Sequence, residues 1–228
     1  MNNMNYLVGD SRVRGLRDYV PRLDFCDIWS RPGARVQNMF ELVDDLTILH
    51  HGESNTKAHF YFSVGICDIT ERLRGPDYEE VIFNSTQFQD RKLVLYQEID
   101  RLASATRNQY AMPVFCTIYP LGLSVWNHHR LNTGRTNRLV HENSYSDMQR
   151  NLEIEIAEFN NYLVRTNINN GFTTPMMHRD LIHNRGRGRS IVRYNDLADG
   201  CHLNNLALMR CKTSLMVAYT KNKNRHRH

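Results

Sequence analysis

Short apolar segments rich in β-branched and aromatic residues alternate along this chain with longer amphipathic stretches. Strand-like segments occur at five places: Met4–Val8, Asp24–Trp29, Phe60–Val64, Val114–Ile118 and Pro175–His178. Stretches with helical periodicity lie between and after them: Val13–Val20, Val36–Val43, Gln89–Ala105, Asp147–Leu163 and Asn204–Tyr219. This alternation is typical of βαβ units. It predicts an α/β fold with a parallel, five-stranded sheet.

The length and composition fit a single domain. The chain has 228 residues, of which 41% are hydrophobic and 23% charged, and no Pro/Gly/Ser-rich linker divides it. We therefore expect one globular domain over residues 1–220, followed by a basic, flexible tail at 221–228. The formal net charge of +5 allows a polyanionic partner without requiring one.

The cysteines and the amino-terminal residues bear on the cellular compartment. Five scattered cysteines form no Cys-x-x-Cys pair, which disfavours a disulfide framework or a zinc site and favours a reducing compartment. The first residues, MNNMNYLVGDS, lack the basic and long apolar segments of a signal peptide. No apolar run reaches the length of a membrane span. The expectation is an intracellular protein with no membrane span.

Two segments depart from this regular alternation. Residues 120–147 form a long polar connection, which in a compact domain is usually a functional loop or a disordered one. If it covers a site as a lid, Trp126, His128 and Arg130 are its expected substrate contacts; otherwise it is a solvated loop. The stretch 183–190, HNRGRGRS, and the tail 221–228 are basic and could bind nucleic acid non-specifically.

Small and polar residues follow the strand-like segments, where ligands bind in open α/β sheets. The first segment is followed by GDS, ending in Ser11, the second by RPGARVQ with Gly33, and the third by GICD with Cys67. Near the end of the chain, DGCHLN supplies Asp199 and His202. A serine, glycine-containing turns and an Asp-x-x-His unit at one sheet edge are the parts of an acyl-transfer site.

Each of these residues has a chemical role that its position permits. Ser11 begins a predicted helix, whose backbone N–H groups can stabilise an oxyanion beside the hydroxyl. Gly33 would offer a further N–H, unobstructed by a side chain. The imidazole of His202 could take the proton of Ser11 while Asp199 fixes the imidazole tautomer. Simpler interpretations also stay open, since a serine can be only a helix cap, a histidine only a surface residue, and Pro-Gly or Asp-Gly only a turn.

Four blocks of the sequence resemble those of the SGNH (GDSL-type) hydrolases, in the family's order. They are GDSRVRG, PGARVQNMFELV, VGICDIT and DGCHLN, and together they span most of the chain. The first, second and fourth are also similar to SGNH domains encoded by some retroelements and animal viruses. The resemblance implies a flavodoxin-like three-layer α/β/α sandwich and a serine hydrolase that cleaves an ester, thioester or O-acetyl group. It assigns Ser11, His202 and Asp199 to a catalytic triad, and the N–H groups of Ser11 and Gly33 to the oxyanion.

The third block departs from the family pattern. The family carries an asparagine there as a side-chain oxyanion donor, but in this chain the position is Cys67. A thiol is a weaker donor than an amide, and loss of one oxyanion donor typically costs about 10²–10³ in turnover. Three outcomes stay open: a slow enzyme, replacement of the donor by His50, His51 or Asn55, or a catalytically degenerate protein. That degenerate protein would bind nucleic acid or a protein partner of a viral or mobile element.

Two histidine pairs, His50-His51 and His128-His129, raise the question of a metal site. Adjacent histidines on an extended chain point in opposite directions, and no carboxylate or cysteine stands at ligand spacing from them. We therefore expect neither a metal nor another cofactor. The expected partner is a small acylated substrate.

Overall fold

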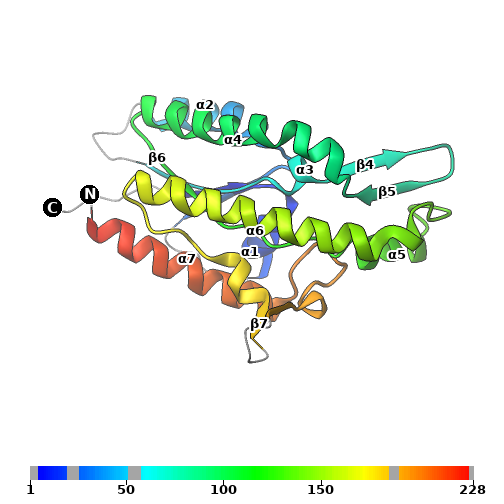
Figure 1. Ribbon diagram of the computed structural model, residues 1–228. Helices are drawn as coiled ribbons and strands as arrows, with labels where there is room; N and C mark the ends of the chain where they lie inside the picture. Colours follow the sequence, from blue (N-terminus) through cyan, green and yellow to red (C-terminus); the bar gives the residue numbers. More distant parts are fainter. Residues whose placement is uncertain (1–4, 20–25, 51–57, 185–189, 226–228) are drawn as a thin grey trace.

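The computed structural model describes residues 5–19, 26–50, 58–184 and 190–225, and Figure 1 shows the arrangement of their elements. The strands are β1 (Asn5–Gly9), β2 (Asp27–Ser30), β3 (His59–Ser63), β4 (Glu71–Arg74), β5 (Glu79–Ile82), β6 (Met112–Phe115), β7 (Ile182–Asn184) and β8 (Ser190–Val192). The α-helices are α1 (Ser11–Tyr19), α2 (Asn38–His50), α3 (Ile66–Ile69), α4 (Ser85–Asn108), α5 (Leu123–Asn132), α6 (Tyr145–Asn169) and α7 (Asn205–Arg225). Short 3-10 helices are η1 (Glu142–Ser144), η2 (Met177–Leu181) and η3 (Tyr194–Asp196).

The central sheet is parallel and has the strand order β2-β1-β3-β6. The chain therefore moves from β1 outward to β2, and then crosses back over β1 to build the other half with β3 and β6. The strand order reverses between β1 and β3. In doubly wound sheets, ligands bind outside the carboxyl ends of the strands at this switch point. Ser11 follows β1 there, and Cys67 follows β3.

Helices cover both faces of the sheet, which gives three layers (Figure 1). Along β1, Tyr6 and Val8 join the core under α2, α4 and α6, whereas Leu7 joins the core under α1 and α7. Along β3, Phe60 and Phe62 face the first core and Tyr61 the second. Alternate side chains of a strand point to opposite faces, so a strand buried on both faces must be apolar throughout. The apolar runs in the sequence have this cause.

The predicted three-layer α/β/α sandwich is confirmed, but the number of strands is not. The sheet has four parallel strands among the described residues, and β2 and β6 are its two edges. The fifth predicted strand, Pro175–His178, does not form; its last residues belong to η2. The pattern of apolar residues there is too short to distinguish a strand from another buried segment.

Asparagine side chains occupy the edge where a fifth strand was expected. Asn167 of α6 accepts a hydrogen bond from the Phe115 N–H (2.9 Å) and donates one to the Phe115 carbonyl (2.7 Å). Two helical turns earlier, Asn160 makes the same two bonds with Ile118, at 2.8 and 2.7 Å. A carboxamide carries one acceptor and a donor in the geometry of a peptide group. These two buried side chains therefore satisfy the free backbone groups of β6 and the segment after it.

Two other segments differ from the sequence prediction. The connection 120–147 contains α5 and η1, because Trp126 and Arg130 on one face of α5 are buried and Asn127 is held by the backbone of Val81. The basic tail expected to be flexible from residue 221 is helical to Arg225. There, buried Asn222 exchanges two hydrogen bonds with the backbone of Thr173. Within the described residues, no helix has the length and apolar character needed to cross a membrane.

The edge role of Asn167 makes a prediction about stability. Asn167→Ala leaves the buried N–H and C=O of Phe115 without partners, and we expect the free energy of unfolding to fall by about 2–4 kcal/mol in urea denaturation. Asn161→Ala is the matched control, because Asn161 lies on the same helix and is exposed; its effect should stay within about 0.5 kcal/mol. Equal losses in the two variants would contradict the edge role.

Candidate active site

Asp10, not Ser11, caps helix α1. The Asp10 carboxylate accepts the backbone N–H of Arg12 at 2.9 Å and three further hydrogen bonds from the Arg12 guanidinium. That guanidinium also donates to the carbonyl of Tyr119 at 3.1 Å. Because Asp10 takes the capping role, the hydroxyl of Ser11 is available for other contacts. The interpretation of Ser11 as only a helix cap is therefore wrong, because Asp10 is the cap.

The Asp10–Arg12 pair is almost completely buried, with 1% and 4% of each residue exposed. Burial by itself lowers the pKa of Arg12, but the charge of Asp10, its hydrogen bonds with Arg12 and the neighbouring Tyr119 together outweigh burial, so the pKa is raised and the guanidinium stays charged. The ring of Tyr119 lies 4.8 Å from the guanidinium carbon. A charge pair with every partner in place fixes the start of α1 at one position relative to the segment after β6.

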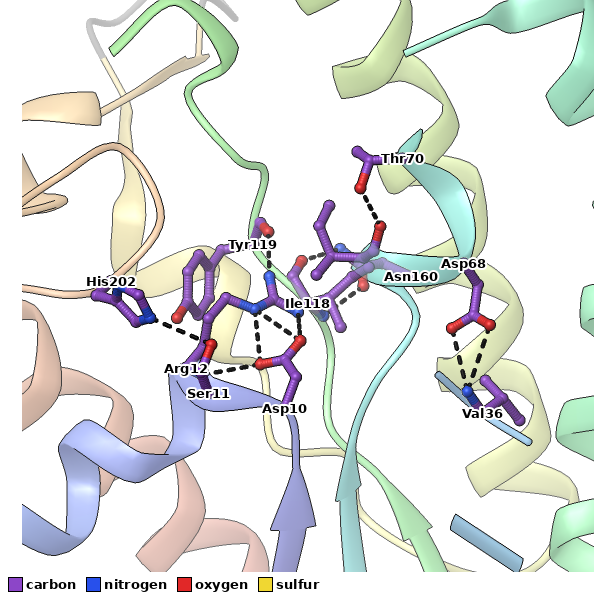
Figure 2. A network of polar contacts seen from close by, with 11 residues as sticks. Asp10, Ser11, Arg12, Val36, Asp68, Thr70, Ile118, Tyr119, Asn160 and His202 are labelled. Atoms are coloured by element: carbon purple, nitrogen blue, oxygen red, sulfur yellow. Dashed lines mark hydrogen bonds and ion pairs between the residues drawn. The ribbon is translucent and has the colours of Figure 1, made fainter. Parts of the chain in front are cut away.

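The structure brings Ser11, His202 and Asp199 together, although 191 positions separate the first two. Figure 2 shows the contact between Ser11 and His202. His202 Nε2 lies 3.2 Å from Ser11 Oγ, and His202 Nδ1 lies 2.7 Å from Asp199 Oδ2. The second distance fits a hydrogen bond in which Nδ1–H donates to the carboxylate, which leaves Nε2 as an acceptor for the serine proton. This geometry permits a proton to pass from Ser11 Oγ to His202 while Asp199 orients the imidazole ring.

Asp199 is held as a carboxylate by its neighbours. Burial raises its pKa, but hydrogen bonds from the His202 ring and from the backbone N–H groups of His202 and Cys201 lower it to about 2. Those N–H groups lie 2.8 and 2.9 Å from Asp199 Oδ1. Asp199 and Gly200 therefore also form the turn that the Asp-Gly pair indicates in the sequence. One oxygen of Asp199 closes the turn and the other faces the imidazole.

The loop that carries His202 is seated on the amino-terminal end of α5. Gly200 has φ +86°, and a β-carbon there would come within 2.4 Å of the Trp126 backbone nitrogen. Its carbonyl accepts the N–H of Gly122 at 2.7 Å. The rings of Trp126 and His202 meet edge to face, with centroids 5.8 Å apart. Only glycine permits this close approach, so α5 and the His202 loop form one unit.

Gly33 occupies a tight turn after β2. The N–H of Ala34 bonds to the carbonyl of Arg31 at 3.1 Å, Pro32 takes the second position, and Gly33 has φ +71°. This combination is typical of a type II turn. No atom lies within 4 Å of where a Gly33 β-carbon would be, so the space beside it is open, and Gly33 lines the cleft.

Cys67 lies in α3, after β3, and lines the same cleft as Ser11 and Gly33. Burial, and secondarily the charge of Asp10, raise the pKa of the Cys67 thiol to about 11. The thiol is therefore protonated near neutral pH. It can donate a weak hydrogen bond, but it lacks the thiolate character that a cysteine nucleophile needs.

Asp68, the next residue, ties the third sequence block to the second. Its carboxylate accepts the N–H of Val36, at 3.2 Å to the nearer oxygen (Figure 2). Burial raises the pKa of Asp68 to about 7, although the bond from Val36 acts in the opposite direction. This contact links the α3 segment that carries Cys67 to the segment that follows Gly33.

A cleft of about 670 Å³ opens over these residues. Of the predicted substrate contacts, Trp126 and Arg130 line it, since they lie one helical turn apart on α5. His128 does not. It lies between them on another face of α5 and binds Glu142, with 2.8 Å between Nε2 and the carboxylate. The polar composition of 120–147 hides this helical spacing in the sequence.

Several predicted features cannot be placed. His51 and Asn55, considered as replacement donors, lie outside the described residues, as do 185–189 of the basic stretch; the side chain of His50 is also undescribed. The ends of the basic stretch pair as the antiparallel strands β7 and β8. Among described residues, no three His, Cys, Asp or Glu side chains gather as a metal ion would require.

Sequence reasoning missed four arginines. Arg12 is the buried partner of Asp10 described above, and the Asp-x-Arg spacing after a strand is a signal that could have indicated it. The other three line the cleft beside Arg130 and Arg135, which belong to the polar segment 120–147 singled out in the sequence: Arg14, Arg35 and Arg72. They come from separate segments, so no local pattern in the sequence announces their convergence.

Comparison with solved structures reveals several with the same architecture. A GDSL-like lipase from Bacteroides thetaiotaomicron matches with a TM-score of 0.65 at 10% identity, covering 97% of this chain and 89% of the lipase chain. A member of the lipolytic G-D-S-L family from Veillonella parvula matches with a TM-score of 0.59 at 15% identity, covering 95% and 98%. The OSK domain of Drosophila Oskar matches with a TM-score of 0.54 at 15% identity, covering 93% and 86%.

These likenesses, at such low identity, concern the fold. No protein-family model matches the chain, and a search of curated proteins also finds no match.

The raised pKa of Asp68 predicts a pH-dependent stability. Since the pKa is about 7 in the folded chain and 3.8 ordinarily, the carboxylate ionises more readily when unfolded, and stability falls as pH rises from about 4 to 7. Asp68→Asn removes this loss, so between pH 5 and pH 8 the variant should gain about 2 kcal/mol relative to the parent in urea denaturation. Asp45→Asn, at an exposed position of α2, is the control and should follow the parent. A parallel response of Asp68→Asn and the parent would contradict the assignment.

Proposed function

We propose that this chain, which has the fold of the SGNH (GDSL-type) hydrolases, is a serine hydrolase that cleaves an ester, thioester or O-acetyl group. The observation that carries the proposal is the short path from Ser11 Oγ through both nitrogens of His202 to Asp199. A helix cap or a surface histidine alone would not require this alignment of three side chains from two distant segments.

In the proposed reaction, Ser11 Oγ attacks the acyl carbon while His202 Nε2 takes the hydroxyl proton. The C–O or C–S bond to the leaving group then breaks, and His202 returns the proton to the leaving atom. Water attacks the acyl-serine by the same path in reverse, releasing the acid and restoring the Ser11 hydroxyl. Asp199 keeps Nδ1 protonated and stabilises the imidazolium that forms twice in the cycle.

The proposed oxyanion site consists of the backbone N–H groups of Ser11 and Gly33 and the thiol of Cys67. Ser11 is the first residue of α1, whose terminal N–H groups have no partner within the helix. Gly33 lines the cleft in an open turn. The Cys67 thiol is protonated and adds only a weak donor, which favours a slow hydrolase.

The cleft offers room for a small acylated substrate. Its volume, about 670 Å³, lies within the range of small-molecule sites. We propose that α5 provides one wall through Trp126 and Arg130, in place of the irregular lid expected from the sequence. Each of the five cysteines is a free thiol, which favours a reducing, intracellular compartment for the reaction.

A second candidate is a binding protein that has lost catalysis. The observation in its favour is Cys67, since it replaces a strong donor by a weak one. Such a protein would hold a nucleic acid or a protein partner at the same sheet edge. The two candidates differ in one property, the reactivity of Ser11.

That reactivity can be measured with a fluorophosphonate probe. We expect labelling of the native chain, loss of labelling in Ser11→Ala, and a decrease of about 10²-fold or more in the labelling rate of His202→Ala, because the serine loses its base. Ser104→Ala is the control, since Ser104 lies on α4 away from the cleft and should label as the parent does. Labelling that persists in Ser11→Ala would remove the assigned nucleophile.

The oxyanion role of Cys67 gives a separate prediction. Cys67→Asn restores an amide donor, so kcat/KM for 4-nitrophenyl acetate should rise by about tenfold or more. Cys67→Ala is the matched control: it removes the thiol without adding a donor and should not raise kcat/KM. If the native chain and Cys67→Asn both fail to label and to hydrolyse the ester, the degenerate binding protein becomes the preferred function.

A further inference from the structure

The cleft beside Ser11 is strongly cationic. Its lining contains Arg14, Arg35, Arg72, Arg130 and Arg135, whereas Glu71 is the only acidic residue among the described lining residues. Glu71 is itself paired with Arg91, at 2.9 Å. The positive charge along the cleft is therefore not balanced by the residues that line it.

Three of these arginines gather where the β4–β5 hairpin meets α5. The carboxylate of Glu79 forms ion pairs with Arg130, at 2.9 Å, and with Arg72, at 3.1 Å. It also lies 3.5 Å from Arg74. Burial lowers the pKa of Arg130, Glu79 raises it, and the like charges of Arg72, Arg135 and Arg74 lower it again. Arg135 thus joins a cluster in which cations outnumber the carboxylate that holds them together.

Arg130 is not an ordinary surface cation. Only 8% of the residue is exposed, and in the described structure its Nε has no hydrogen-bond partner. The buried indole Nε1 of Trp126 likewise has no partner among the described residues. Both side chains line the cleft. Buried donors without partners are uncommon in folded proteins, and a water molecule, an ion or a ligand commonly supplies the missing acceptor.

This cationic group lies close to the proposed catalytic residues. The Arg130 guanidinium lies 5.9 Å from the centre of the Trp126 ring, and that ring lies 5.8 Å from the ring of His202. A bound substrate with its acyl carbon at Ser11 can therefore contact Arg130 through a second substituent. A spacer about the size of one aromatic ring would separate the two groups of the substrate.

We infer that the substrate of this site is an ester that carries an anionic oxygen group, a phosphate or a carboxylate, which Arg72, Arg130 and Arg135 bind. The inference rests on the proposed hydrolase function and specifies its substrate class. Guanidinium groups present paired N–H donors that match the oxygens of phosphate and carboxylate. Two exposed arginines around one buried arginine in a cleft suit a single compact anion. An extended polyanion would be followed by cations along an open groove instead.

Matched acetyl esters test this inference. The anionic substrates are 4-acetoxyphenyl phosphate and 4-acetoxybenzoate, and the neutral reference is methyl 4-acetoxybenzoate; acetate release measures the cleavage of each. We expect kcat/KM for at least one anionic ester to exceed that of the neutral ester about tenfold or more at low salt. The preference should shrink as ionic strength increases. The better of the two anionic esters identifies phosphate or carboxylate as the preferred group.

The arginine variants connect the preference to the cleft. In Arg72→Gln/Arg135→Gln, the ratio of anionic to neutral kcat/KM should fall about tenfold. Arg101→Gln is the matched control, because Arg101 is exposed on α4 and does not line the cleft; it should leave the ratio unchanged. Cleavage of the neutral ester equal to or faster than both anionic esters, with no change in the double variant, would overturn the inference while leaving the hydrolase function in place.

Binding separates failure of the inference from failure of the proposed function. If no ester is cleaved, the hydrolase proposal fails. Calorimetric titration of Ser11→Ala with phenyl phosphate then tests anion recognition by itself. Binding that the double arginine variant weakens supports anion recognition, and absence of binding overturns it. A single-stranded oligonucleotide that displaces phenyl phosphate at far lower concentration, with a steep salt dependence, would also overturn it in favour of a nucleic-acid ligand.

Discussion

The site depends on the buried ion pair between Asp10 and Arg12. Arg12 binds the carboxylate of Asp10 and the carbonyl of Tyr119, so one guanidinium joins the end of β1, the start of α1 and the segment after β6. With Asp10 as the cap, Ser11 presents its hydroxyl at the switch point of the sheet, where His202 meets it. Removing either charge would leave the other buried without its partner, which usually costs several kcal/mol. The Asp10–Arg12 ion pair, rather than the contacts of Ser11 itself, thus sets the position of the serine.

Buried asparagines hold the elements around this centre. Asn160 and Asn167 fasten α6 to the free edge of the sheet, and Asn127 fastens α5 to Val81 of the β4–β5 hairpin. Each carboxamide satisfies both the N–H and the C=O of one residue, as a neighbouring strand would. Because Asn127 lies on the helix that carries Trp126 and Arg130, this contact also fixes the wall of the cleft. Polar side chains here perform a structural task that the apolar pattern does not encode.

The buried ion pair and the buried asparagines explain which parts of the fold and of the site can be predicted from the sequence. The buried strands and the long helices α4 and α6 follow from hydrophobic period, and the block order located Ser11, Asp199 and His202, which the structure brings together. The sheet has one strand fewer than expected because asparagines, not a strand, cover β6. The periodicity of α5 was hidden within a polar segment, so His128 was grouped with Trp126 and Arg130 although it faces elsewhere. The arginine cluster arises from separate segments and needs the fold to become visible.

Cys67 and the arginine cluster are best understood together. In the proposed mechanism, a thiol in place of an amide weakens stabilisation of the oxyanion, which lowers the rate for a substrate held only at its acyl group. Binding energy from a remote part of a substrate can contribute to catalysis when it fixes the reacting carbon against the nucleophile. An anion held by Arg130 and its neighbours would act in this way, since Trp126 connects that region to His202. A site with a weak oxyanion donor and a strong remote anchor would therefore be selective: slow toward simple neutral esters and efficient only toward substrates that engage both ends of the cleft.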